Sequence, residues 1–172
     1  MKLKFLALLW MACLLTACGI QAALNTNADD VAAAADAIVD FTAPASYSPE
    51  FLAEINGYTV VSYRPNQGNG HLYLVQSRDA ADASQMEEAL NEMNPGEKNR
   101  KARLTVLETR ALTVREQEAT LVISEGTNGN GEGYRQATLA FEGKSGPALL
   151  AFSESLAAWD IETVEALIAS VH

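Results

Sequence analysis

Polar and apolar residues alternate along much of the chain, which is the pattern expected of half-buried strands. Residues 58–63 (YTVVSY) and 72–75 are rich in β-branched and aromatic residues, and Asn69-Gly70 between them predicts a β-hairpin. Four further strands are expected, joined by polar or glycine-rich turns, over residues 104–113, 117–124, 134–142 and 148–152. The pattern predicts a hairpin followed by a four-strand antiparallel run.

Two other stretches carry apolar residues with helical spacing. Residues 82–93 place an apolar stripe on one face, and Pro95-Gly96 ends the stretch. Residues 161–171 carry a second stripe, and Asp160 stands where it can cap the helix. Two helices are therefore expected, with stripes formed by Ala83, Met86, Leu90 and Met93 and by Ile161, Val164, Leu167, Ile168 and Val171.

The segment before the hairpin is predicted from shorter signals. Ile38–Phe41 is a brief apolar piece that stops before Pro44, and it suits a first strand. Residues 46–55 are expected to form a helix that begins at Ser48-Pro49-Glu50, because proline is favoured at the first helical position. Together the elements predict an α+β fold in which helices flank an antiparallel sheet.

The N-terminus has the organisation of a secretory signal. Lys2 and Lys4 precede an apolar run from Phe5 to Leu15, which is about half the roughly 20 residues that a bilayer-spanning helix needs. The next residues, Leu15-Thr16-Ala17-Cys18, resemble the lipobox of bacterial lipoproteins. The resemblance implies that residues 1–17 are a signal peptide, that cleavage falls between Ala17 and Cys18, and that Cys18 carries the lipid.

The resemblance also implies where the protein is located. Three acyl chains, palmitate among them, would hold Cys18 in a membrane, and anchoring by more than one chain is stable. No later stretch of the sequence is long and apolar enough to span a bilayer. Gly19 is not the aspartate associated with retention in an inner membrane. We therefore expect a lipid-anchored protein on a cell membrane or outer membrane, facing away from the cytoplasm.

The sequence after Cys18 divides into a tether and a domain. Residues 18–37 are rich in alanine, asparagine and aspartate, with few large apolar side chains, which is typical of a linker. Its alanine-rich part, residues 28–37, has high helix propensity but is short for an isolated helix, so coil and helix both remain open. Residues 38–172 have the length and apolar content of a single α+β domain.

Charge and cysteine content restrict the partners and the chemistry. Removal of Lys2 and Lys4 with the signal leaves 10 basic and 22 acidic residues, a net charge of −12. Such a surface repels phosphate backbones and anionic headgroups, so we expect no nucleic acid partner. Cys13 leaves with the signal and Cys18 is consumed by the lipid, so no disulfide remains to staple the fold.

The order of the elements resembles the Mog1/PsbP-like superfamily, which includes secreted or lipid-anchored bacterial proteins of the DcrB type. The matching segments are Gly57-Tyr58, the helix at 82–93, Thr138-Leu139-Ala140-Phe141 and Ile168-Ala169-Ser170-Val171, and they cover about 57–171. The resemblance implies an α/β/α sandwich around an antiparallel sheet. It departs at Glu116-Gln117, where a glycine is expected, and its assorted roles fix no activity.

The sequence contains few candidate catalytic residues. His71 and the terminal His172 are the only imidazoles, so a Cys/His site is excluded and a Ser/His/Asp site would require His71. No Gly-x-Ser-x-Gly motif is present. A lone histidine at the start of a strand is more often a residue of a sheet face or edge, although paired carboxylates stay open in so acidic a chain.

Metal and phosphate motifs are equally incomplete. Asn128, Asn130 and Glu132 resemble the first half of an EF-hand loop, but Leu139 stands where the bidentate acid belongs. There is no zinc ligand set, and neither glycine-rich loop has the ending of a P-loop. We therefore expect no metal and no cofactor.

Residues 98–103 form a local basic stretch on this acidic protein. Lys98, Arg100, Lys101 and Arg103 could dock an anionic partner or a lipid headgroup, or they could form a solvated loop before a strand. The sequence leaves both interpretations open.

The function expected from these features is that of a lipid-anchored, non-catalytic binding or interaction protein whose partner is a protein or a small ligand. An envelope assembly factor is one alternative, and a carboxylate-based hydrolase is another. If a ligand site exists, the residues most suited to line it are Tyr58, Tyr63, His71, Tyr73 and Arg135.

Overall fold

The computed structural model describes residues 24–79, 83–93, 104–128 and 130–172, and these ranges contain three helices and seven strands. The elements in chain order are α1 (Ala28–Ile38), β1 (Tyr47–Ile55), β2 (Tyr58–Pro65), β3 (His71–Ser77), α2 (Ala83–Met93), β4 (Thr105–Val114), β5 (Gln117–Thr127), β6 (Gly133–Glu142), β7 (Pro147–Ser155) and α3 (Ile161–Ala169).

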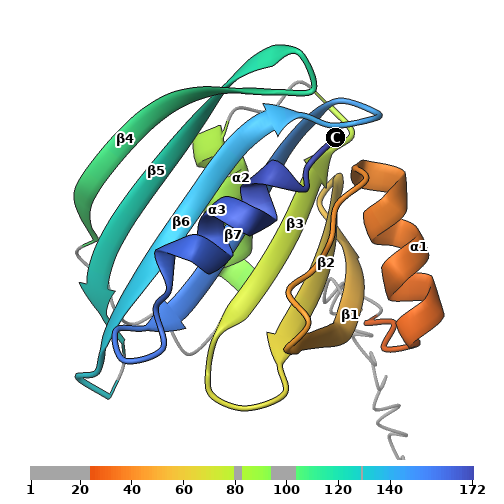
Figure 1. Ribbon diagram of the computed structural model, residues 1–172. Helices are drawn as coiled ribbons and strands as arrows, with labels where there is room; N and C mark the ends of the chain where they lie inside the picture. The colour runs from red at the N-terminus through yellow and green to blue at the C-terminus, as the bar shows by residue number, and fades with distance from the viewer. Residues whose placement is uncertain (1–23, 80–82, 94–103, 129) are drawn as a thin grey trace, which may run out of the picture.

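All seven strands belong to one antiparallel sheet with the order β1-β2-β3-β7-β6-β5-β4. The strands of the first half and the four-strand run join where β3 pairs with β7, so the last strand of each group lies in the middle of the sheet. In Figure 1, α3 lies in front of the sheet and α2 behind it, while β1 and β4 form the two outer edges. The fold is α+β, with an antiparallel sheet flanked by helices.

The larger core lies between the sheet and the two helices α1 and α3. One row of buried aliphatic side chains crosses five neighbouring strands in register, formed by Leu121, Leu139, Leu150, Leu74 and Val61. Helix α3 adds Val164 and Leu167 to this core. Because successive strand residues alternate between faces, the register that buries this row sends the intervening residues to the other side.

The second core is smaller and lies under α2. Met86 of this helix is almost fully buried against Val60, Val75 and Leu149, which come from the three strands β2, β3 and β7. The predicted stripe of this helix therefore faces the sheet at Met86, and Ala83 and Leu90 pack against the same cluster. Both faces of the central strands are covered, which explains their nearly continuous apolar sequences.

The boundary between tether and domain differs from the one expected from sequence. The expected tether extended to residue 37, but residues 28–37 belong to helix α1, whose Val31 and Ala35 are fully buried. The side chain of Asn27 caps the helix by accepting hydrogen bonds from the amides of Asp29 and Asp30. Packing against the sheet stabilises a helix that would be marginal alone, so the domain begins before α1.

Two other predictions for this segment are wrong. Ile38–Phe41 is not a strand, because Ile38 ends α1 and the following residues form no regular element. Residues 46–55 are not a helix but contribute β1, in which Pro49 pairs with Tyr63 beside a β-bulge. Proline is tolerated in an edge strand next to a bulge, because a ladder hydrogen bond is not required there.

The remaining elements confirm the predicted pattern. The β2–β3 hairpin, both amphipathic helices and the four strands of the second half are present, with boundaries shifted by a few residues. Asp160 caps α3 as expected, since its carboxylate accepts hydrogen bonds from the amides of Glu162 and Thr163. A hydrogen bond from the Thr163 hydroxyl, together with these amides, lowers the pKa of Asp160.

Two hairpin turns show how residue choice affects backbone strain. Asn56 and Gly57 join β1 to β2, and both have positive φ, as a two-residue type I′ turn requires. Arg115 and Glu116 join β4 to β5 with φ values of 52° and 63°, although neither residue type favours this region. The turn has no glycine, so Arg115 and Glu116 adopt positive φ at a cost in backbone strain.

Replacing Glu116 with glycine should relieve part of that strain. Glu116→Gly is expected to raise the free energy of unfolding by about 0.5–1 kcal/mol, because the gain at positive φ exceeds the entropic cost of glycine. Urea denaturation would measure the change. The matched control is Glu118→Gly in the adjoining strand β5, where the same substitution should destabilise the protein. A decrease in stability for Glu116→Gly would contradict the turn assignment.

Candidate functional site

A group of aromatic and polar side chains lies on the α2 face of the sheet, over strands β1 to β3. His71 and Tyr73 are two residues apart in β3, so both point to this face, and their rings stack 5.5 Å apart with an angle of 15° between planes. Phe51 of β1 approaches Tyr73, with 6.5 Å between ring centroids. These three rings form a partly exposed aromatic surface.

A carboxylate and a hydroxyl group adjoin the rings. Glu50 lies at the β-bulge of β1, and its Oε2 accepts a hydrogen bond of 2.7 Å from the hydroxyl of fully buried Ser62. The same oxygen lies 3.9 Å from Nδ1 of His71, which is beyond hydrogen-bonding distance. Within the described ranges, this buried Nδ1 has no hydrogen-bond partner.

The connectivity of this group decides what chemistry it can perform. In a serine hydrolase the hydroxyl donates its proton to histidine, which a carboxylate then orients. Here the Ser62 hydroxyl donates to Glu50, and Ser62 has no exposed surface from which to attack a substrate. The arrangement therefore differs from that of a serine hydrolase, and its partly exposed groups are the rings of His71, Tyr73 and Phe51.

The residues that the sequence suggested for a ligand site are divided between the two faces. Tyr58 and Tyr73 lie on the α2 face with His71. Tyr63 belongs to the opposite core, where its ring meets Phe41 at 5.7 Å and burial raises its pKa. Arg135 also points away from His71 and pairs with Glu125 at 2.9 Å. The five residues therefore do not form one site.

Glu50, Phe51 and Ser62 were not predicted as site residues. Glu50 and Phe51 were missed because residues 46–55 were predicted to form a helix, whereas only a strand places these two residues beside β2. Asn56-Gly57 was the signal that could have revealed this strand, since the dipeptide is typical of a hairpin between two apolar runs.

Several predicted features lie outside the described residues. They include the cleavage site between Ala17 and Cys18, the lipid attachment at Cys18 and the basic stretch from Lys98 to Arg103. These predictions stand as they were made.

The loop with partial EF-hand spacing is closed by its own side chains. Oδ1 of Asn128 accepts hydrogen bonds from the amides of Asn130 and Glu132, and its Nδ2 donates to the Glu132 carboxylate. These contacts are those of a side-chain-stabilised turn. In the part of the chain that the structure describes, no three His, Cys, Asp or Glu residues are grouped as a metal site would require.

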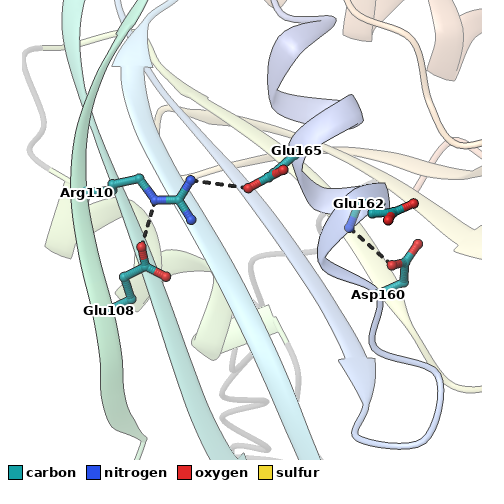
Figure 2. Close-up of polar contacts among 5 residues, drawn as sticks. All are labelled: Glu108, Arg110, Asp160, Glu162 and Glu165. Carbon is teal, nitrogen blue, oxygen red and sulfur yellow. Dashed lines mark hydrogen bonds and ion pairs between the residues drawn. The ribbon is translucent and has the colours of Figure 1, made fainter.

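A second polar group connects the edge strand β4 to helix α3. Figure 2 shows Arg110 of β4 between Glu108 of the same strand, at 2.7 Å, and Glu165 of α3, at 3.3 Å. The hydrogen bonds to Glu108 and Glu165 raise the pKa of Arg110. All three side chains are well exposed, so the pairs add little to stability. Their charges remain accessible on the surface near one sheet edge.

The chain matches no protein-family model and no curated protein. Among the helices within the described ranges, none combines the length and apolarity needed to cross a membrane.

Proposed function

We propose that this protein is a lipid-anchored, extracytoplasmic binding protein with no catalytic role of its own. The observation that carries the proposal is Leu15-Thr16-Ala17-Cys18, placed directly behind Lys2, Lys4 and an apolar run. Lipid on Cys18 would attach the domain to a cell membrane or outer membrane. The partner of this domain would be a protein or a small ligand, and its acidic surface disfavours nucleic acid.

The preference for binding over catalysis rests on the group around His71. The Ser62 hydroxyl donates its hydrogen bond to Glu50. The rings of His71 and Tyr73 offer a stacking surface beside the Glu50 carboxylate. Such a surface suits a ligand with a flat or apolar part and a hydrogen-bond donor. An assembly factor for the cell envelope would use the same surface for a protein partner, and it remains the second candidate.

We also propose membership of the Mog1/PsbP-like superfamily, with an α/β/α sandwich. The support is the order of elements: strands, then α2, then four antiparallel strands and a closing helix, with helices on both faces of the sheet. Membership would account for the anchored, non-enzymatic role, because roles in that superfamily include partner binding and assembly.

Site-specific photocrosslinking in intact cells tests the binding role. A photoreactive aromatic amino acid would replace His71, whose side chain is 36% exposed and lies within the ring cluster. The same amino acid at exposed Ala157, in the turn before α3, provides the matched control. We expect a covalent adduct with a protein or small ligand from position 71 and none from position 157.

Equal or absent labelling at the two positions would contradict a binding site at His71. An adduct with a component of a larger envelope complex, together with loss of that complex on gene deletion, would favour the assembly role. A captured molecule that is chemically converted by the purified protein would instead support an enzyme.

A further inference from the structure

The two outer edges of the sheet are protected to different degrees. At β1, the amide and carbonyl of Leu52 pair with Asn25 at 2.7 and 2.9 Å, and Pro49 with its bulge interrupts the strand. At β4, no residue of the described ranges hydrogen-bonds to the outer side of the strand. Unpaired amides and carbonyls along such a strand can template pairing with another chain.

Three large apolar side chains are exposed at the start of β4 and in the residue before it. Leu104, Val106 and Leu107 retain 40%, 58% and 50% of their accessible surface. Natural edge strands usually carry charges or prolines to prevent association. The charges on β4 come only at Glu108 and Arg110, beyond these apolar residues.

These two charges make the strand complementary to itself. In an antiparallel sheet, two residues that lie opposite each other point to the same face. When two copies of one strand pair by two-fold symmetry, the axis must therefore pass through a residue position and not between two residues. An axis at Glu108 would oppose two carboxylates, and an axis at Arg110 would oppose two guanidinium groups. An axis at Thr109 instead places each Glu108 opposite an Arg110, twice by symmetry.

We propose that β4 pairs antiparallel with β4 of a second copy of this chain, about a two-fold axis at Thr109. The pairing puts Thr109 opposite Thr109 of the partner subunit, and Glu108 opposite Arg110 of the partner subunit. Arg110 keeps its contact with Glu165 of α3, because a guanidinium has donors for more than one carboxylate (Figure 2). The two sheets become one.

The interface is small, because the bulge between Val106 and Glu108 limits regular pairing to the stretch around Thr109. An interface of this kind falls in the weak, transient class in solution. Confinement of both copies to one membrane through Cys18 would raise their effective concentration. The pairing should therefore be trapped covalently on the membrane.

Thr109→Cys is the trapping variant. Opposite residues of an antiparallel pair have Cα atoms about 4.5–5.5 Å apart, which a disulfide can bridge. Thr113→Cys is the matched control, because Thr113 is equally exposed on the same strand and face. Two-fold pairing at Thr109 separates the two copies of residue 113 by roughly 26 Å, four strand residues on each side of the axis.

Full-length chains carrying each variant would be oxidised in membranes and analysed without reductant. We expect the Thr109→Cys chain to form at least about tenfold more disulfide-linked dimer than the Thr113→Cys chain. Equal yields, or a Thr109 adduct with a different protein, would overturn the assignment of a second copy. A dimer of the unsubstituted chain would show a free thiol at Cys13 or Cys18, which contradicts signal removal or lipidation but leaves the comparison of the two variants readable.

Charge reversal then tests the register. In the Thr109→Cys background, Glu108→Arg or Arg110→Glu should each lower dimer yield about tenfold, because like charges become opposed twice. The double reversal should restore the yield, and a mixture of the two single variants should crosslink with each other. Failure of the double variant to recover, with its thermal melting unchanged, would overturn the proposed register.

Discussion

Substitution of Cys18 by alanine is expected to abolish lipid attachment and leave a precursor that retains residues 1–17. The sulfur of Cys18 is the atom to which lipid would be added, so the alanine variant offers no attachment point for the acyl chains. Metabolic labelling with an alkyne fatty acid would measure the first effect, and electrophoretic mobility would measure the second. Nearly all label should be lost from the Cys18→Ala chain.

Cys13→Ala is the matched control, because Cys13 lies in the apolar part of the signal and should be removed with it. This variant should be processed and labelled like the unsubstituted chain. The unsubstituted chain should also stay with membranes in high salt, since a net charge of −12 gives its mature form no electrostatic attraction to anionic lipids. Normal labelling of Cys18→Ala would refute the lipoprotein assignment.

Substitution of Val31 by aspartate is expected to have the largest effect on stability. Val31 lies on α1 with no exposed surface and belongs to the main core. A carboxylate there would be buried without a partner, which should lower the free energy of unfolding by at least about 3 kcal/mol. Small domains are stable by only about 5–15 kcal/mol, so the substitution removes a large fraction of the total stability.

The control for this effect is Ala33→Asp, which adds the same carboxylate to an exposed position two residues later on α1. Its effect should stay within about 0.5 kcal/mol, as for other surface substitutions. Urea denaturation followed by tryptophan fluorescence is a suitable measurement, because Trp159 packs against Phe152 in the core. Equal midpoints for the two variants would mean that α1 is not part of the cooperative domain.

The parts of the fold that could be predicted from sequence are those with strong periodicity. Helix α3 shows an apolar stripe and an N-cap at Asp160, and β5 places Leu121 and Ile123 on one face and Thr120, Val122 and Ser124 on the other. Tertiary packing does not have to override local preference in these elements. Their positions were therefore predicted within a few residues.

The segment before β2 was predicted wrongly because Pro49 and the apolar stripe of α1 can each be interpreted in two ways. Pro49 favours a helix start but is also tolerated at a bulge in an edge strand, and only the sheet reveals which applies. In α1 the buried stripe includes the small residue Ala35, so burial could not be recognised from hydrophobicity alone. For the same reason, the juxtaposition of Glu50, Ser62 and His71 could not be predicted, since it depends on the pairing of three strands.

The pairing of Asn25 with Leu52 has a consequence for how an anchored copy moves. Asn25, where the folded domain starts, is the seventh residue after Cys18, and seven extended residues reach at most about 25 Å. That distance is comparable to the radius of gyration of a domain of this size, roughly 15 Å. With lipid on Cys18, the domain would pivot close to the bilayer surface and meet its partners by lateral diffusion in two dimensions.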